Sequence, residues 1–140
     1  SEGILEWWKD PDEYAQEEEI SVVMYSPNFI KKPELGKRFM LGYLQGVRAY
    51  NDALVWGNKD RDRIVDILTK TTFVDKADTF LQMKPPGLDP DGHVLKDGVI
   101  ADQEWYMKQG LVKTRADVDK IIDDSYVEYA LKILGEYKKP

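Results

Sequence analysis

The feature that most constrains this chain is an apolar repeat between Pro33 and Trp56. Within it, apolar residues recur at spacings of three and four, the period of one face of an α-helix. Pro33 and Glu34 suit the first turn of a helix, and Gly57 suits its end. The repeat predicts one long helix of about six turns. Its expected buried stripe comprises Leu35, Phe39, Tyr43, Leu44, Val47, Tyr50 and Leu54.

The segment before this helix predicts a strand followed by a turn. Ile20 to Tyr25 is almost continuously apolar and rich in β-branched residues, as in a strand that is covered on both faces. Ser26 and Pro27 then turn the chain. Open α/β sheets bind ligands beyond the carboxyl ends of their strands. Tyr25 and Ser26 are therefore the candidate substrate-binding residues, and the aromatic pair Trp7 and Trp8 is a further cleft candidate.

Capping residues and apolar spacing predict several more helices along the chain. The expected starts are a short helix near Asp10, then Asp60, Asp75, Asp97 or Gly98, and Asp124. A tight turn at Pro90-Asp91-Gly92 separates two short extended pieces. The total is five or six helices and two or three short strands. Helices with one apolar face need a partner layer, so residues 1–140 read as one incomplete domain of the α/β class.

Composition narrows the classes of function. The chain of 140 residues carries a net charge of −6 and no cysteine. The charge argues against a nucleic-acid partner, and the missing thiols exclude disulfides and sulfur-ligated metals. His93 is the only histidine, which excludes a histidine-based metal cluster or triad. A calcium loop that starts at Asp89 would place Ile100 where a bidentate glutamate is required. No catalytic residue, metal or cofactor is therefore expected, and the chain is not expected to be an enzyme.

Five short motifs carry a resemblance to a known family. They are Pro33-Glu34 at the start of the long helix, Tyr50 near its end, the Pro90-Asp91-Gly92 turn, Gln103-x-Trp105-Tyr106, and Tyr126-Val127 at the start of the last helix. In this combination the chain resembles the C-terminal part of periplasmic solute-binding proteins of the nitrate, sulfonate, taurine and thiamine-pyrimidine family. The resemblance implies a partial lobe of the type II periplasmic binding protein fold, helix-rich with few short strands.

The resemblance also implies a function. Such a protein is the substrate-binding component of an ABC transporter, binds a small polar or anionic solute between two lobes, and docks on a membrane permease. It would work in the periplasm or outside the cell after export, with the export signal lying outside this chain. The fragment itself would complete its missing layer as a homodimer. The alternative from a different class is a self-standing helical protein-interaction domain.

Overall fold

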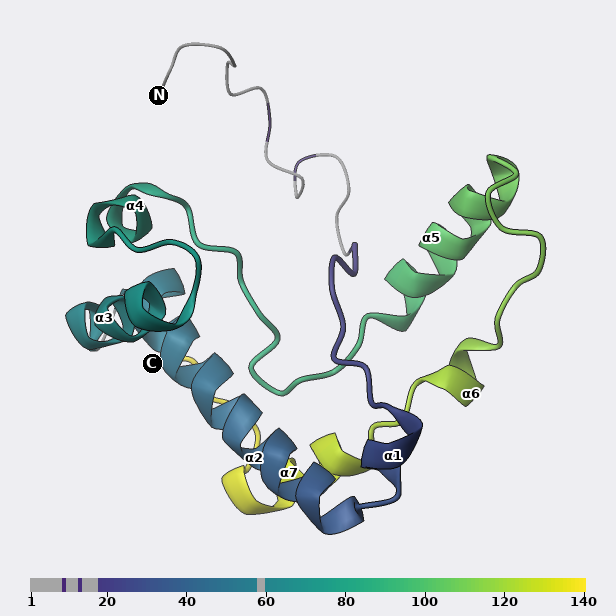
Figure 1. The fold of residues 1–140 in the computed structure, drawn as a ribbon, viewed down its shortest axis with the longest axis horizontal. Helices are drawn as coiled ribbons and strands as arrows, with labels where there is room; N and C mark the ends of the chain where they lie inside the picture. The colour runs from purple at the N-terminus through teal and green to yellow at the C-terminus, as the bar shows by residue number, and fades with distance from the viewer. Residues whose placement is uncertain (1–8, 10–12, 14–17, 58–59) are drawn as a thin grey trace. The chain divides into compact units, whose positions relative to one another are not determined.

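The computed structural model describes residues 9, 13, 18–57 and 60–140, and this part of the chain is helical (Figure 1). The α/β prediction is wrong, and with it the partial lobe of the type II periplasmic binding protein fold, because the described residues form no β-strand. Trp7, Trp8 and the helix expected near Asp10 lie outside the described residues. The elements are α1 (Pro27–Ile30), α2 (Pro33–Tyr50), the π-helical turn η2 (Asn51–Val55), α3 (Arg61–Thr71), α4 (Ala77–Gln82), α5 (Lys96–Lys108), α6 (Val118–Ile121) and α7 (Ser125–Leu134).

The run from Ile20 to Tyr25, expected to be a buried strand, belongs to no regular element. Its side chains are largely exposed, with Ile20 at 76% and Met24 at 86%. A strand is stabilised by a hydrogen-bonded neighbour, and no partner strand exists among the described residues. The chain instead enters a short helix, α1, in which Ser26 is the N-cap and its Oγ accepts a hydrogen bond from the Phe29 N–H at 3.2 Å.

The long helix expected from Pro33 to about Trp56 is present as α2 followed directly by η2. Its buried face is only partly the expected one. Phe39 and Tyr43 are 44% and 37% exposed, whereas the buried residues of α2 are Gly36, Met40, Leu44 and Val47. The expected burial of Leu44, Val47 and Leu54 is confirmed. That of Leu35, Phe39 and Tyr43 is wrong. The two faces lie one residue apart on the helix, and both have the same three-to-four spacing.

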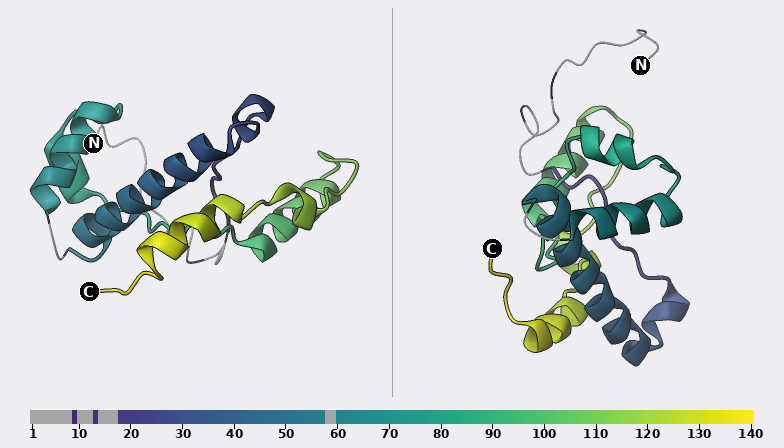
Figure 2. Two further views of the ribbon diagram at one scale, coloured as in Figure 1. Left: turned by 90° about the horizontal axis from the view of Figure 1, so that it is seen from below. Right: turned by 90° about the vertical axis from the view of Figure 1, so that its left-hand side faces the viewer.

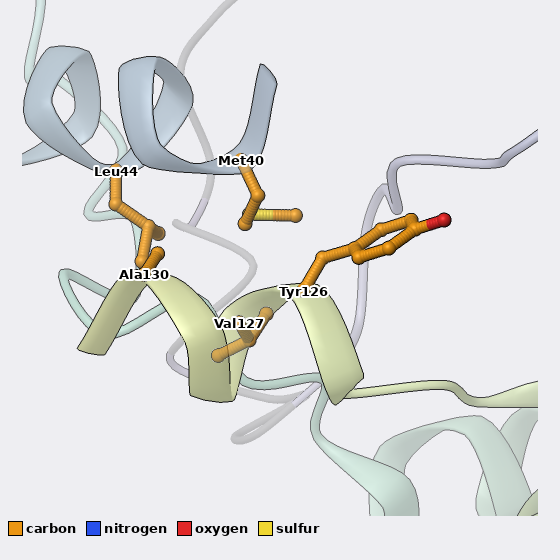
Figure 3. Packing of buried hydrophobic residues seen from close by; sticks show 5 residues of the cluster. All are labelled: Met40, Leu44, Tyr126, Val127 and Ala130. Atoms are coloured by element: carbon orange, nitrogen blue, oxygen red, sulfur yellow. The ribbon is translucent and has the colours of Figure 1, made fainter. Parts of the chain in front are cut away.

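The last helix decides which face of α2 is buried. In Figure 3, Met40 and Leu44 of α2 point toward Tyr126, Val127 and Ala130 of α7. These five residues form a hydrophobic core that we call the α2–α7 cluster. Leu44 and Ala130 are completely buried. Burial of a leucine side chain stabilises a fold by about 1.5–3 kcal/mol.

Glycine at position 36 allows α7 to approach α2 closely. A Cβ atom at Gly36 would lie 2.3 Å from Cε2 of Tyr126, well inside van der Waals contact. The Tyr126 ring thus occupies the space that any other side chain would need. At the other end of α2, Arg48 reaches the carbonyl oxygen of Gly135 just beyond α7. The start of α7 therefore lies near the start of α2, and its end lies near Arg48; the left-hand view of Figure 2 shows the two helices next to each other.

The chain divides into two compact units, of which the second contains the α2–α7 cluster. This second unit comprises Tyr25–His93 and Asp124–Pro140. It holds another core, the α3 cluster, which η2, α3 and α4 form from Ala53, Leu54, Ile64, Val65 and Phe80. The first unit comprises Ser1–Met24 and Val94–Asp123 and contains α5 and α6.

The predicted helix starts are close to the observed ones, but the expected caps are not formed. Asp60 and Asp124 directly precede α3 and α7, and neither side chain makes a capping hydrogen bond. Asp60 adopts a left-handed conformation with φ of 51°. Gly135 ends α7 with φ of 70°, as its sequence position predicts. Among the described residues, no helix is both long and apolar enough to cross a bilayer.

Candidate functional site

The guanidinium of Arg48 on α2 makes several hydrogen bonds within the second unit. Its Nε donates to the carbonyl oxygen of Pro90 at 2.9 Å, and its Nη2 donates to Asp91 Oδ1 and to the carbonyl oxygen of Gly135, both at 2.7 Å. The same guanidinium lies 5.7 Å from the ring centroid of Tyr137. One side chain thus joins α2, the Pro90–Gly92 turn and the C-terminal tail, which is residues 135–140. We call these groups the Arg48 centre.

Asp91 is the acceptor that completes the Arg48 centre. Besides the bond from Arg48, its Oδ1 accepts the backbone N–H of Tyr137 at 2.9 Å. The Arg48 and Asp91 side chains are 15% and 22% exposed, so this ion pair is largely shielded from water. Electrostatic interactions are stronger in such a setting than at an exposed surface. The pair therefore holds the tail against α2.

The turn that presents Asp91 is held by Asp89 and requires a glycine. The Asp89 carboxylate accepts the N–H groups of Asp91 and His93 at 2.9 and 3.0 Å. Gly92 has φ of 77°, and a Cβ atom there would lie 2.5 Å from Cδ2 of Leu44. These bonds explain Asp89 and Asp91 as turn residues. His93 is exposed beside the turn.

The π-helical turn η2 lies next to the Arg48 centre and places a buried amide. Asn51 is 1% exposed, and its Nδ2 donates to the carbonyl oxygen of Leu88 at 2.7 Å while its Oδ1 accepts the Leu88 N–H at 3.3 Å. The side chain therefore satisfies both backbone groups of one residue, as a neighbouring strand would. Single π-helical turns occur frequently at functional sites. The end of α2 is therefore a candidate functional site.

Two phenols complete this region, and both have a perturbed pKa. Burial raises the pKa of Tyr50, whose hydroxyl donates to the carbonyl oxygen of Pro86 at 3.1 Å. Partial burial and the hydrogen bond to the Asp52 carboxylate raise the pKa of Tyr137. Both phenols are therefore neutral donors at neutral pH. Tyr50 donates to the carbonyl oxygen of Pro86 and Tyr137 to the carboxylate of Asp52, so each hydroxyl already has an acceptor within the protein.

The Arg48 centre holds three segments of the chain together by hydrogen bonds. The donors that Arg48 directs inward are satisfied by protein oxygens, so an anionic ligand would first have to displace Asp91 or a carbonyl group. Among the described residues, no group of three histidine, aspartate or glutamate side chains could hold a metal ion. The centre accordingly fixes the tail and the turn on α2.

The residues proposed from sequence for solute binding lie elsewhere in the second unit. Tyr25 stacks on Phe29 with ring centroids 5.3 Å apart and meets the Tyr126 ring edge-on at the same distance. Ser26 caps α1. Both residues therefore have structural contacts at the end of the α2–α7 cluster. Sequence reasoning did not single out Arg48, Asn51 or Tyr137, because each gains its partners from segments that are distant along the chain.

One cavity lies within the first unit. It has a volume of about 370 Å³ and is lined by Ile100 of α5 and by residues 115–119. Its acidic residues are paired: Asp117 with Lys120 at 3.0 Å and Asp119 with Lys96 at 3.1 Å. Its arginine, Arg115, lies 3.5 Å from Glu104. The walls thus combine apolar surface with charges that other side chains already neutralise.

Comparisons of the chain with protein-family models, with curated proteins and with solved structures gave no match.

Proposed function

We propose that this chain contributes a helical part of the solute-binding component of an ABC transporter for a small polar or anionic solute of the nitrate, sulfonate, taurine or pyrimidine kind. The proposal is based on the five motifs that resemble that family. It implies a role in binding without catalysis and a place in the periplasm or outside the cell. A membrane permease would be the protein partner.

The observation that carries the proposal is that two of these motifs, the Pro90-Asp91-Gly92 turn and Tyr126-Val127, meet in space beside α2. Gly92 of the Pro90–Gly92 turn lies against Leu44 of α2, and the Cβ position of Gly92 is also 3.7 Å from Val127 of α7. Tyr126, next to Val127, packs on Gly36 near the start of α2. The motifs are separated by tens of residues in the sequence, yet they form one packed arrangement. This convergence supports a shared structural signature over a chance set of short matches.

The test begins with the polypeptide that the source cell makes, which is recovered with an antibody against this chain. Calorimetry then measures its affinity for candidate solutes. We expect the polypeptide to bind one of the solutes nitrate, taurine, an alkyl sulfonate or an aminopyrimidine with micromolar or better affinity. The chain of 140 residues alone should bind none of them tightly, because it would supply one side of a cleft. Failure of the cellular polypeptide to bind any of the four would refute the proposal.

Site-directed variants of that polypeptide test the candidate residues. Tyr25→Phe keeps the ring contacts with Phe29 and Tyr126 and removes the hydroxyl. His93→Ala is the control, a substitution at an exposed position outside the candidate site. We expect Tyr25→Phe to weaken binding more than His93→Ala does. Equal affinities would remove Tyr25 from the site and leave the family assignment standing.

A second candidate function is a self-standing helical protein-interaction domain. The observation in its favour is the exposed face of α2, where Leu35, Phe39 and Tyr43 are 46%, 44% and 37% exposed. Large apolar side chains that adjoin one another on a surface often mark an interaction site. Phe39 stacks on Tyr43 with ring centroids 6.2 Å apart, so the rings are held in place before any partner arrives.

A further inference from the structure

The start of α2, where its exposed face begins, is rich in positive charge. Residues 31–38 contain Lys31, Lys32, Lys37 and Arg38 against one acid, Glu34, which gives this short segment a net charge of +3. Glu34 pairs with Lys37 at 2.7 Å. Lys31, Lys32 and Arg38 are exposed and make no ion pair within the described part of the chain. We call Leu35, Phe39 and Tyr43 with these three cations the basic aromatic face.

The rings of this face are preorganised, and the surface beside them is open. Phe39 contacts Phe29 edge-on at 5.8 Å in addition to its stacking on Tyr43. Gly42 and Gly46 lie next to these rings on α2, and among the described residues no atom lies within 4 Å of either Cβ position. Bulky side chains of a partner can therefore approach the helix backbone between the rings.

The sequence itself contains a segment of matching chemistry. Residues 1–19 hold a single cation, Lys9, and eight carboxylates, a net charge of −7, whereas the whole chain carries −6. Residues 20–140 are therefore almost neutral, at +1. The same 19 residues include apolar side chains that suit an aromatic surface. The carboxylates are Glu2, Glu6, Asp10, Asp12, Glu13, Glu17, Glu18 and Glu19, and the apolar residues are Ile4, Leu5, Trp7, Trp8, Tyr14 and Ala15.

We propose that the basic aromatic face of α2 binds the acidic segment 1–19 of a second copy of this chain, and that the exchange is reciprocal. Opposite charges favour this pairing, and a two-fold arrangement uses the same face and segment twice. An anionic membrane is the less favourable occupant, because stable attachment needs a larger cluster of basic residues and the chain as a whole is negative. The proposal is independent of solute binding.

The first test is the solution mass of the purified chain, measured by sedimentation over a range of concentrations. We expect a monomer–dimer equilibrium that weakens as salt rises, because exposed charges are screened within about 8 Å at physiological ionic strength. The triple variant Lys31→Glu, Lys32→Glu, Arg38→Glu should raise the dissociation constant roughly tenfold or more. Lys113→Glu is the control, since Lys113 is also exposed and lies outside the face.

A charge-swap pair makes the test specific for this occupant. The second variant carries Asp12→Lys, Glu17→Lys and Glu18→Lys in the acidic segment. Each variant alone should dimerise more weakly than the wild type, because like charges then face each other, and mixing the two should restore the dimer. Circular dichroism should show that both variants keep their helices.

Three results would overturn the proposal. They are a monomeric wild-type chain at all concentrations, a dimer that the triple variant leaves intact, and a mixture of the two variants that stays monomeric. Binding of a monomeric wild-type chain to vesicles of anionic lipid, lost in the triple variant, would assign the face to a membrane and would also refute the proposal.

Discussion

Replacement of Gly36 by alanine tests the contact that orients α2. The new Cβ atom would lie 2.3, 2.4 and 2.9 Å from three ring carbons of Tyr126. The ring has little room to move, because it is 7% exposed and meets the Tyr25 ring edge-on. Overpacking of a core costs about 1–3 kcal/mol. Alanine inside a helix returns about 0.5–1 kcal/mol relative to glycine. We therefore expect a net loss of roughly 1–2 kcal/mol in the free energy of unfolding.

The same helix offers a matched control. Gly42→Ala makes the same chemical change on α2, and its Cβ position meets no described atom within 4 Å. This variant should gain about 0.5–1 kcal/mol, since the helix propensity acts alone. The two variants should thus shift the unfolding midpoint in opposite directions. Urea denaturation followed by circular dichroism measures both, at high salt and low concentration so that association does not contribute.

A double-mutant cycle assigns the loss to Tyr126. In a Tyr126→Ala background the ring is absent, so Gly36→Ala should become stabilising by about 0.5–1 kcal/mol. If Gly36→Ala stabilised the wild-type chain as much as Gly42→Ala does, α7 would not pack on α2 through Tyr126. The buried face of α2 would then have to be reassigned.

Three further predictions follow from contacts in the second unit. Asp91→Ala removes the acceptor of two hydrogen bonds in a largely shielded ion pair and should lower the free energy of unfolding by about 2–3 kcal/mol. Glu34→Ala, in an exposed pair, should lower it by less than about 1 kcal/mol. Equal losses in urea denaturation would contradict the role of Asp91 in holding the residues after α7 on α2. Phe39→Ala should cost roughly 1 kcal/mol, below the 3–5 kcal/mol of a buried phenylalanine, and a loss of 3 kcal/mol or more would show that the ring is enclosed. The pKa values of Tyr50 and Tyr137 are raised in the folded protein above their ordinary value of about 10. The contribution of these phenols to stability is therefore complete below about pH 10 and is lost as the pH rises through the folded-state pKa values. The free energy of unfolding should therefore fall more steeply above pH 10 in the wild type than in a variant with phenylalanine at both positions, and parallel pH profiles would refute the assignment.

The candidate site was only partly predictable. Asp91 and Gly92 were placed correctly in a tight turn, because the Pro-Asp-Gly combination has a local preference for that conformation. Arg48 carries no local signal, since an arginine on the polar flank of a helix is usually solvated. Its role depends on Pro90, Asp91 and Gly135, which the fold brings to it from 42 to 87 residues away. The role of Asn51 depends in the same way on Leu88, 37 residues further along the chain.

Local chemistry in the sequence determined where the long helices run. The three-to-four repeat after Pro33 and the glycines at positions 57 and 135 act within a few residues, so they predict α2 and the end of α7 without knowledge of the fold. The run from Ile20 to Tyr25 has a local preference for strand, but a strand also needs a partner from another segment. No such partner strand exists in the described part of the chain.

The tertiary structure decided which edge of the apolar stripe of α2 is buried. The predicted stripe is broad: it includes Phe39 and Tyr43, which are exposed, and Leu44, which is buried beside Met40. The hydrophobic effect favours burial of either edge and does not choose between them. Close packing fixes the contact, because the Tyr126 ring of α7 occupies the space beside Gly36, where α2 has no side chain.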